Sequence, residues 1–115
     1  MTASSRARPF DIWLAYLRFA DRPQTGKVRP VLVVAVKEDL IAVAKATSRP
    51  PASNSGDVGI AGWRQAGLNV PSTVRCSQVF ELAPGDLLRG DPIGRLPAAE
   101  IDQVALQLVA LGYFE

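Results

Sequence analysis

A short apolar run in the N-terminal half of the chain limits the folds open to it. Residues 31–36 read Val-Leu-Val-Val-Ala-Val, with Pro30 before them and the polar turn Lys37–Asp39 after them. A β-branched run of this length, bounded by turn residues, predicts a buried strand. Proline has no N–H to donate to a sheet ladder, so we expect the strand to begin at Pro30.

Other segments of similar length also predict strands, at residues 11–19, 40–46 and 72–82. The segments between them, including residues 20–26 and 50–59, are rich in turn-forming residues. Residues 60–68 fit either a short strand with a turn or one helical turn. Short strands with turn-rich connections favour a small, curved antiparallel sheet or barrel.

The clearest single element is a helix near the C-terminus. Pro97 and Glu100 suit its first turn, and Gly112 suits its end. Apolar residues recur between them at helical spacing, at Ile101, Val104, Ala105 and Leu108. Leu106 and Val109 are apolar as well, so we expect this helix to have more than one apolar face.

Composition limits the organisation of the chain and its partners. With 115 residues, we expect one domain over residues 10–115, preceded by a flexible basic N-terminus over residues 1–9. The net charge of +2 permits a polyanionic partner without requiring one. No signal-like segment and no run long enough for a membrane helix is present, which predicts a cytoplasmic protein without membrane contact.

The absence of histidine excludes several kinds of active site. It removes the commonest general base, the commonest zinc ligand and every nucleophile that histidine activates. The one cysteine, Cys76, lies in an apolar-flanked strand and is expected to be a core thiol. Asp86 and Asp91 stand beside glycines and have no metal-ligand spacing, so we predict turn residues, with no metal and no cofactor.

Arg29 and Thr47 form the most informative pair. Arg29 opens the second predicted strand and Thr47 closes the third, so an antiparallel hairpin around Asp39 brings both to one edge of the sheet. A guanidinium offers a fork of donors that fits a phosphate, and a hydroxyl can donate to an oxygen that gains charge. Cations near this edge add positive potential, at Lys27, Lys45 and Arg49.

Simpler interpretations of the same residues remain open at this stage. Arg29 fits a solvated strand end, and Thr47 with Ser48 fits a turn whose hydroxyls bond to local backbone. Trp13 and Trp63 have faces on which bases can stack, but aromatic residues in small barrels usually belong to the core.

Five segments, taken in order, resemble a known family. They are Asp11-Ile12-Trp13, Arg29-Pro30-Val31-Leu32-Val33-Val34, Ala46-Thr47-Ser48, Pro71-Ser72-Thr73-Val74 and Ile93-Gly94-Arg95-Leu96. Their order and spacing resemble the MazF/PemK toxins of type II toxin–antitoxin systems, over about residues 10 to 111. The sequence departs from that pattern at Phe10, where glycine is usual, and at Ser77, where an aspartate usually precedes the glutamine.

The resemblance implies a mainly β fold with a C-terminal α-helix, a small SH3-like barrel that forms a homodimer. It implies metal-independent, sequence-specific cleavage of single-stranded messenger RNA, with Arg29 and Thr47 as the catalytic residues. It also implies a cognate antitoxin protein as partner. Around the catalytic pair we expect RNA contacts from Lys27, Lys45, Ser48, Arg49 and Gln78, with base specificity set in the loop from Ser48 to Gly67.

Two alternatives stay open beside the nuclease. The chain is either a member of the same fold that binds RNA or a protein without cutting, or a protein-interaction barrel that uses the apolar helix surface around Leu106 and Val109. Arg29 separates them: a nuclease needs it for cleavage, an RNA binder only for affinity, and an interaction barrel not at all.

Overall fold

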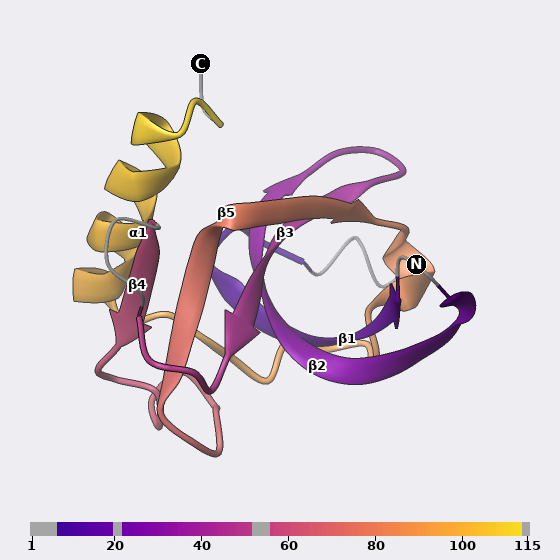
Figure 1. The fold of residues 1–115 in the computed structure, drawn as a ribbon, viewed down its shortest axis with the longest axis horizontal. Coiled ribbons are helices and arrows are strands. Elements are labelled where there is room, and N and C mark those ends of the chain that lie inside the picture. The colour runs from indigo at the N-terminus through magenta and orange to yellow at the C-terminus, as the bar shows by residue number, and fades with distance from the viewer. Residues whose placement is uncertain (1–6, 20–21, 52–55, 114–115) are drawn as a thin grey trace.

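The computed structural model describes residues 7–19, 22–51 and 56–113. Six strands form one sheet in the order β4-β5-β3-β2-β1-β6, and every neighbouring pair is antiparallel. Their bounds are β1 Asp11–Phe19, β2 Arg22–Val36, β3 Ile41–Thr47, β4 Asp57–Ile60, β5 Ser72–Leu82 and β6 Gly94–Arg95. The sheet curls on itself, and the helix α1 (Ala98–Ala110) lies beside β4 and β5 (Figure 1). This confirms the expected mainly β barrel with a C-terminal helix.

The second strand is longer than the sequence predicted. It begins at Arg22 rather than Pro30, and the predicted turn over residues 20–26 is wrong for its described part. Lys27 and Gly26 lie opposite Leu17 and Arg18 of β1. Pro30 is tolerated inside β2 because the ladder to β3 begins only at Val31, so β2 is still a free edge on that side.

The loop predicted over residues 50–59 also contains the start of a strand. β4 begins at Asp57 because it pairs with β5 over Asp57–Ile60. After β4 the chain makes a hydrogen-bonded turn, in which the N–H of Ala66 donates to the oxygen of Gly62 and that of Leu68 to the oxygen of Trp63. The ambiguous segment over residues 60–68 is therefore the end of a strand followed by a turn.

Alternate residues of β2 enter two different core clusters, as expected for a strand buried on both faces. Leu32 and Val34 pack in the cluster that includes Val104 and Leu108 of α1. Val31 and Val33 pack on the other face of the sheet, in a second cluster that includes Trp13, Ile41, Val43 and Leu82. All four residues from Val31 to Val34 are buried, which confirms the predicted strand.

Cys76 belongs to the first of these clusters and is fully buried. Burial disfavours the thiolate and raises the pKa of Cys76 to about 11, and the nearby carboxylate of Asp57 adds to this effect. A thiol of this kind is protonated at neutral pH and is a poor nucleophile. The structure therefore agrees with the expected core thiol.

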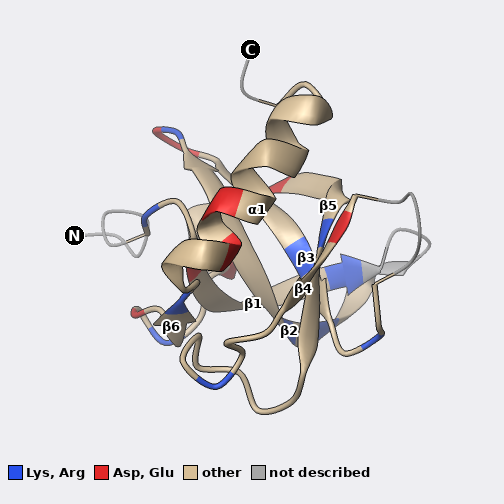
Figure 2. Ribbon diagram, turned by 90° about the vertical axis from the view of Figure 1, so that its left-hand side faces the viewer, with Lys and Arg blue, Asp and Glu red and all other residues tan. Residues whose placement is uncertain are grey.

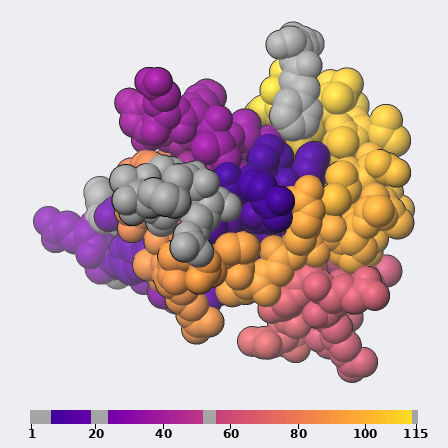
Figure 3. Space-filling model, turned by 180° about the vertical axis from the view of Figure 1, so that it is seen from behind, coloured from indigo at the N-terminus to yellow at the C-terminus, as the bar shows by residue number. Residues whose placement is uncertain are grey.

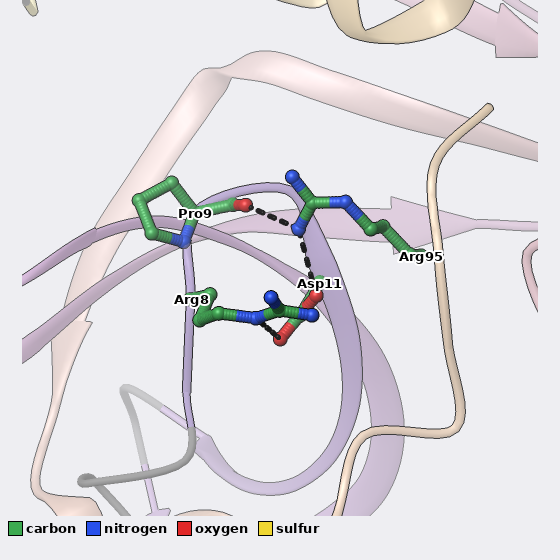
Figure 4. A network of polar contacts seen from close by, with 4 residues as sticks. All are labelled: Arg8, Pro9, Asp11 and Arg95. Atoms are coloured by element: carbon green, nitrogen blue, oxygen red, sulfur yellow. Dashed lines mark hydrogen bonds and ion pairs between the residues drawn. The ribbon is translucent and has the colours of Figure 1, made fainter. Parts of the chain in front are cut away.

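A polar network fixes the entrance to β1 (Figure 4). Asp11 is buried, and its Oδ1 accepts a hydrogen bond of 2.9 Å from Arg95 of β6, which also donates to the carbonyl oxygen of Pro9 at 3.0 Å. The exposed Arg8 lies with its Nε 3.7 Å from Asp11 Oδ2. This network holds β6 against β1 and fixes residues 8 and 9 of the N-terminal segment; residues 1–6 of that segment lie outside the described residues.

Phe10, where the family usually has glycine, takes the backbone conformation that favours glycine. Its φ is 72°, in the left-handed region. The backbone is held from both sides: the N–H of Phe10 donates to the oxygen of Val33 at 2.7 Å, and its oxygen accepts from Leu96 at 3.1 Å. The first turn therefore keeps its shape at the cost of some backbone strain.

Two glycines let β6 and the turn after β4 touch through their backbones. A Cβ on Gly94 would meet the carbonyl oxygen of Ala66, and one on Gly67, whose φ is +84°, would meet that of Ile93. Seen from behind, the segment around residues 60–70 lies directly against the segment that leads to α1 (Figure 3). This approach fixes the position of the turn that ends at Gly67.

We predict that Gly94→Ala lowers the free energy of unfolding by about 2–3 kcal/mol, because two backbone segments must separate to admit a methyl group. Gly85→Ala is the matched control, since a Cβ there meets nothing within 4 Å. Urea denaturation of both variants measures the difference. A Gly94→Ala variant as stable as Gly85→Ala would contradict the close approach.

We predict that Cys76 makes the protein less stable as the pH rises from 9 to 11. The thiol has its ordinary pKa of 9.0 in the unfolded chain, whereas burial raises its pKa to about 11 in the folded protein. The unfolded state therefore loses a proton first, and stability falls by about 1–3 kcal/mol across this window. Denaturation of the wild type and Cys76→Ala at pH 8 and pH 10.5 measures this loss, which should be smaller in the variant; equal losses would contradict the prediction.

Candidate active site

An open groove with a volume of about 650 Å³ lies between the middle of β2, the end of β3 and the segment that follows Gly67. We call it groove 1. Four cationic side chains line it, at Arg29, Lys45, Arg49 and Arg75. No carboxylate stands among the described residues that line it. Groove 1 is therefore a strongly positive surface suited to an anion.

Arg29 and Thr47 both line groove 1, so the structure brings the predicted pair together. The β2–β3 ladder pairs Val31 with Lys45, and the same register continued by two residues sets Thr47 opposite Arg29. Arg29 is exposed, and its guanidinium donates to the neighbouring carbonyl of Val28 at 3.1 Å. The remaining donors of this guanidinium are available to a ligand.

The Thr47 hydroxyl is oriented by its own turn. Its oxygen accepts a hydrogen bond of 3.3 Å from the N–H of Arg49, which is the local contact expected of a turn hydroxyl. The backbone of Arg49 is held in addition by Thr73, whose hydroxyl donates to the Arg49 carbonyl at 2.7 Å. Because the Thr47 oxygen is used as an acceptor, its own proton remains free to be donated into groove 1.

A second groove of about 640 Å³ adjoins the first, and we call it groove 2. Arg29 and Lys45 line both grooves, so they form the boundary between them. Groove 2 contains the remaining predicted residues, Lys27 and Gln78, whereas Ser48 and Arg49 lie in groove 1. All seven predicted site residues therefore line one connected surface.

Groove 2 also contains carboxylates, which sets it apart from groove 1. Asp86 accepts a hydrogen bond of 2.9 Å from Arg18, and Glu81 one of 2.9 Å from Lys37. Both carboxylates are thus paired with cations. The turn role expected of Asp86 is seen in part, because it ends a single turn of 3-10 helix at Pro84–Asp86.

Arg75 is a groove residue that the sequence analysis did not assign. It lies opposite Lys45 of β3 and Asp57 of β4, and Figure 2 shows the basic segments of β3 and β5 side by side, away from the acidic residues of α1. Its Nε is buried and has no hydrogen-bond partner. Strand alternation could have predicted its direction, because Val74 and Cys76 enter the core and the residue between them must face the other way.

Both tryptophans belong to the core or pack against it. Trp13 is fully buried in the core, and Trp63 packs against the core with the guanidinium of Arg64 4.8 Å from its ring centroid. Among the described residues, no three His, Cys, Asp or Glu side chains gather where a metal ion could bind. Nor does that part of the chain contain a helix long and apolar enough to cross a membrane.

Comparison with known proteins gives the family. The model of the PemK-like, MazF-like toxins of type II toxin–antitoxin systems matches residues 8–111. Among curated proteins no significant match is found.

Solved structures agree with this match. The Mycobacterium tuberculosis toxin MazF-mt6 is 28% identical and superposes with a TM-score of 0.64, over 87% of this chain and 93% of that chain. An endoribonuclease in complex with its cognate antitoxin from Mycobacterial species (16% identity, TM-score 0.67, 92% and 95% covered) has the same fold. The MazE-MazF structure from Deinococcus radiodurans also has this fold. It is 21% identical and superposes with a TM-score of 0.61, over 92% of this chain and 94% of that chain. The chain belongs to the PemK-like, MazF-like toxin family of type II toxin–antitoxin systems.

Proposed function

We propose that this protein is an endoribonuclease that cuts single-stranded RNA without a metal ion, as the toxin of a type II toxin–antitoxin system. The observation that carries the proposal is groove 1, where Arg29, Thr47 and three further cations meet with no carboxylate among the described lining residues. Such a surface binds a phosphodiester by charge and by directed donors. Family membership supports the same activity.

The proposed chemistry uses a nucleophile that RNA itself supplies. The 2′-oxygen attacks the adjacent phosphorus and the bond from phosphorus to the 5′-oxygen breaks, which leaves a 2′,3′-cyclic phosphate and a 5′-hydroxyl. The phosphorus passes through a five-coordinate state with added negative charge. Arg29, which stays charged at any working pH, stabilises this charge. The alternative role is that of the acid that protonates the leaving 5′-oxygen.

Thr47 is proposed to donate a hydrogen bond from its hydroxyl to the same phosphate. The Arg49 N–H fixes its oxygen, so the hydroxyl can turn toward an oxygen that gains charge in the transition state. The proton of the attacking 2′-hydroxyl passes to solvent water, with no protein group assigned as base. Deprotonated arginine is not available for this step, and the described residues of groove 1 offer no carboxylate.

We propose that the strand continues from groove 1 into groove 2. Lys45 and Arg49 hold phosphates in groove 1, and Lys27 does so in groove 2, where Gln78 adds an amide. Arg75 adds a further guanidinium to groove 1, with a buried Nε that a ligand or water can satisfy. We also propose a cognate antitoxin that covers these grooves, and action in the cytoplasm, where messenger RNA lies.

We predict that the purified protein cuts a long single-stranded RNA at a short recurring sequence in excess EDTA. Arg29→Ala and Thr47→Ala should each lower the rate by about 10²–10³, the usual cost of losing one donor to transition-state charge. Electrophoresis and sequencing of the products measure rate and cut sites.

Three matched variants serve as controls for that experiment. Thr47→Ser keeps the hydroxyl and should keep most activity. Arg29→Lys keeps the charge but loses the fork of donors, so it should be intermediate. Arg64→Ala removes an exposed guanidinium that lines neither groove and should cut at the wild-type rate. Cleavage that persists in folded Arg29→Ala, or never occurs in the wild type, would contradict the proposal.

A second candidate function rests on the apolar surface of α1. Leu106 is 70% exposed and Val109 57% exposed, and the two stand three residues apart on one face of α1. Exposed apolar side chains that lie together on one element favour a protein contact. We propose that they serve the homodimer expected of this family; the alternative is a non-catalytic barrel that binds another protein there.

We predict that Leu106→Glu shifts the protein from dimer to monomer in sedimentation at micromolar concentration, because a carboxylate in an apolar contact must be desolvated. Gln107→Glu, on the neighbouring exposed position, is the control and should leave the mass unchanged. A wild type that is monomeric, or a Leu106→Glu variant that remains a dimer, would rule out this surface as the dimer contact.

A further inference from the structure

Groove 1 continues past the catalytic pair into a third groove of about 500 Å³, which we call groove 3. The two share four lining residues: Leu14, Gly67, Asn69 and Ile93. Asn69 is the one polar side chain in this shared set, so a strand that runs from groove 1 into groove 3 must pass it.

The backbone around Asn69 is held on both sides. Leu68 is 8% exposed, and its N–H donates to the oxygen of Trp63 at 3.0 Å. The carbonyl of Val70 accepts a hydrogen bond of 2.8 Å from the hydroxyl of Ser72. The backbone on either side of Asn69 is thus held, while its side chain is exposed to a ligand.

The segment that carries Asn69 is fixed to the body of the protein at two more points. The N–H of Gly62 donates to Oε1 of the buried Glu100 at 2.8 Å, which ties the start of the preceding turn to α1. The backbone contact between Gly67 and Ile93 fixes its end. Asn69 therefore keeps one position relative to Arg29 and Thr47, which line the same groove.

The chemistry of Asn69 differs from that of its neighbours. The cations and hydroxyls of groove 1 recognise phosphate, which every nucleotide carries, and so they do not distinguish one base from another. A primary amide has one acceptor and two donors side by side, which match a base edge that offers a donor next to an acceptor. Among the described residues of groove 1, Asn69 is the one that carries a side-chain amide.

We propose that Asn69 is a specificity-determining residue that reads the base edge of one nucleotide, an adenine, at a fixed position relative to the cut bond. The inference rests on the proposed function, in that grooves 1 and 3 hold single-stranded RNA. Adenine is chosen because its adjacent donor and acceptor make the standard two-bond pair with an asparagine amide. Unstacked bases of single strands expose such edges to proteins.

The test is a binding selection from a random single-stranded RNA library, carried out on the full chain with Thr47→Ala to suppress cleavage. The same selection is run with Asn69→Ala or Asn69→Asp added. Gln65→Ala is the matched control, because it removes an exposed amide from the preceding turn that lines neither groove 1 nor groove 3. Sequencing of the bound RNA gives the base preference at each position.

The parent is expected to enrich adenine at one position by about 5- to 150-fold, the discrimination of one two-bond pair. Asn69→Ala should abolish this preference alone, with other positions and the salt dependence of binding unchanged, because no phosphate contact is lost. Asn69→Asp should favour a different base at that position, since a carboxylate accepts but does not donate. Gln65→Ala should match the parent.

Each other outcome overturns the inference in a recognisable way. If the parent binds RNA and Asn69→Ala has the same base profile, the inference fails while the proposed function stands. If the parent binds RNA but prefers another base where Asn69 acts, the adenine assignment fails. If the parent binds no RNA at any salt concentration, the proposed function fails together with the inference.

Discussion

The antiparallel ladder between β2 and β3 is the constraint on which the rest of the structure depends. It pairs Val31 with Lys45 and Leu32 with Ala44, and apolar residues on both faces of β2 hold it in register. A slip by one residue would turn every side chain of β2 to the opposite face and take Arg29 out of register with Thr47. The core thus sets the position of the functional pair, because Arg29 and Thr47 stand just beyond the end of the same ladder.

The ladder also gathers several cations at one groove. Lys45 lies opposite Arg75, and Arg29 and Arg49 line the same groove without a carboxylate among its described residues. Like charges brought together repel, so this arrangement is maintained by the packing beneath it rather than by its own contacts. A bound polyanion relieves the repulsion, and for this reason we expect RNA, or an acidic partner segment, to stabilise the fold.

Regular features of the structure were predictable from the sequence, because local patterns decide them. The alternation in residues 72–82 and the apolar spacing of α1 gave the strand and the helix at nearly their observed bounds. The beginning of β2 was not predictable in this way. Proline usually opens a strand, and the extension back to Arg22 depends on pairing with β1, which is a long-range contact.

In the candidate site too, local sequence patterns predict some features, and long-range contacts decide the others. Arg29 and Thr47 follow from the hairpin geometry, and strand alternation was sufficient to turn Arg75 away from the core, although only the paired strands show that it enters groove 1. The network of Asp11 with Arg95 joins residues 84 positions apart, and the contact between Gly67 and Ile93 is made by backbone alone. Neither leaves a local pattern in the sequence, yet both fix the segment that brings Asn69 to the groove.

RNA bound in groove 1 is proposed to be cut by its own 2′-hydroxyl, with no other nucleophile. The most direct measurement uses a short RNA that contains one cut site, with a single 2′-deoxy substitution at the nucleotide whose 2′-oxygen would attack. We expect the substituted RNA to bind with nearly unchanged affinity and to remain uncut in EDTA, while the unmodified RNA yields a cyclic phosphate end. Cleavage of the substituted RNA at the same bond would contradict the claim, because the nucleophile would then have to come from water or the protein.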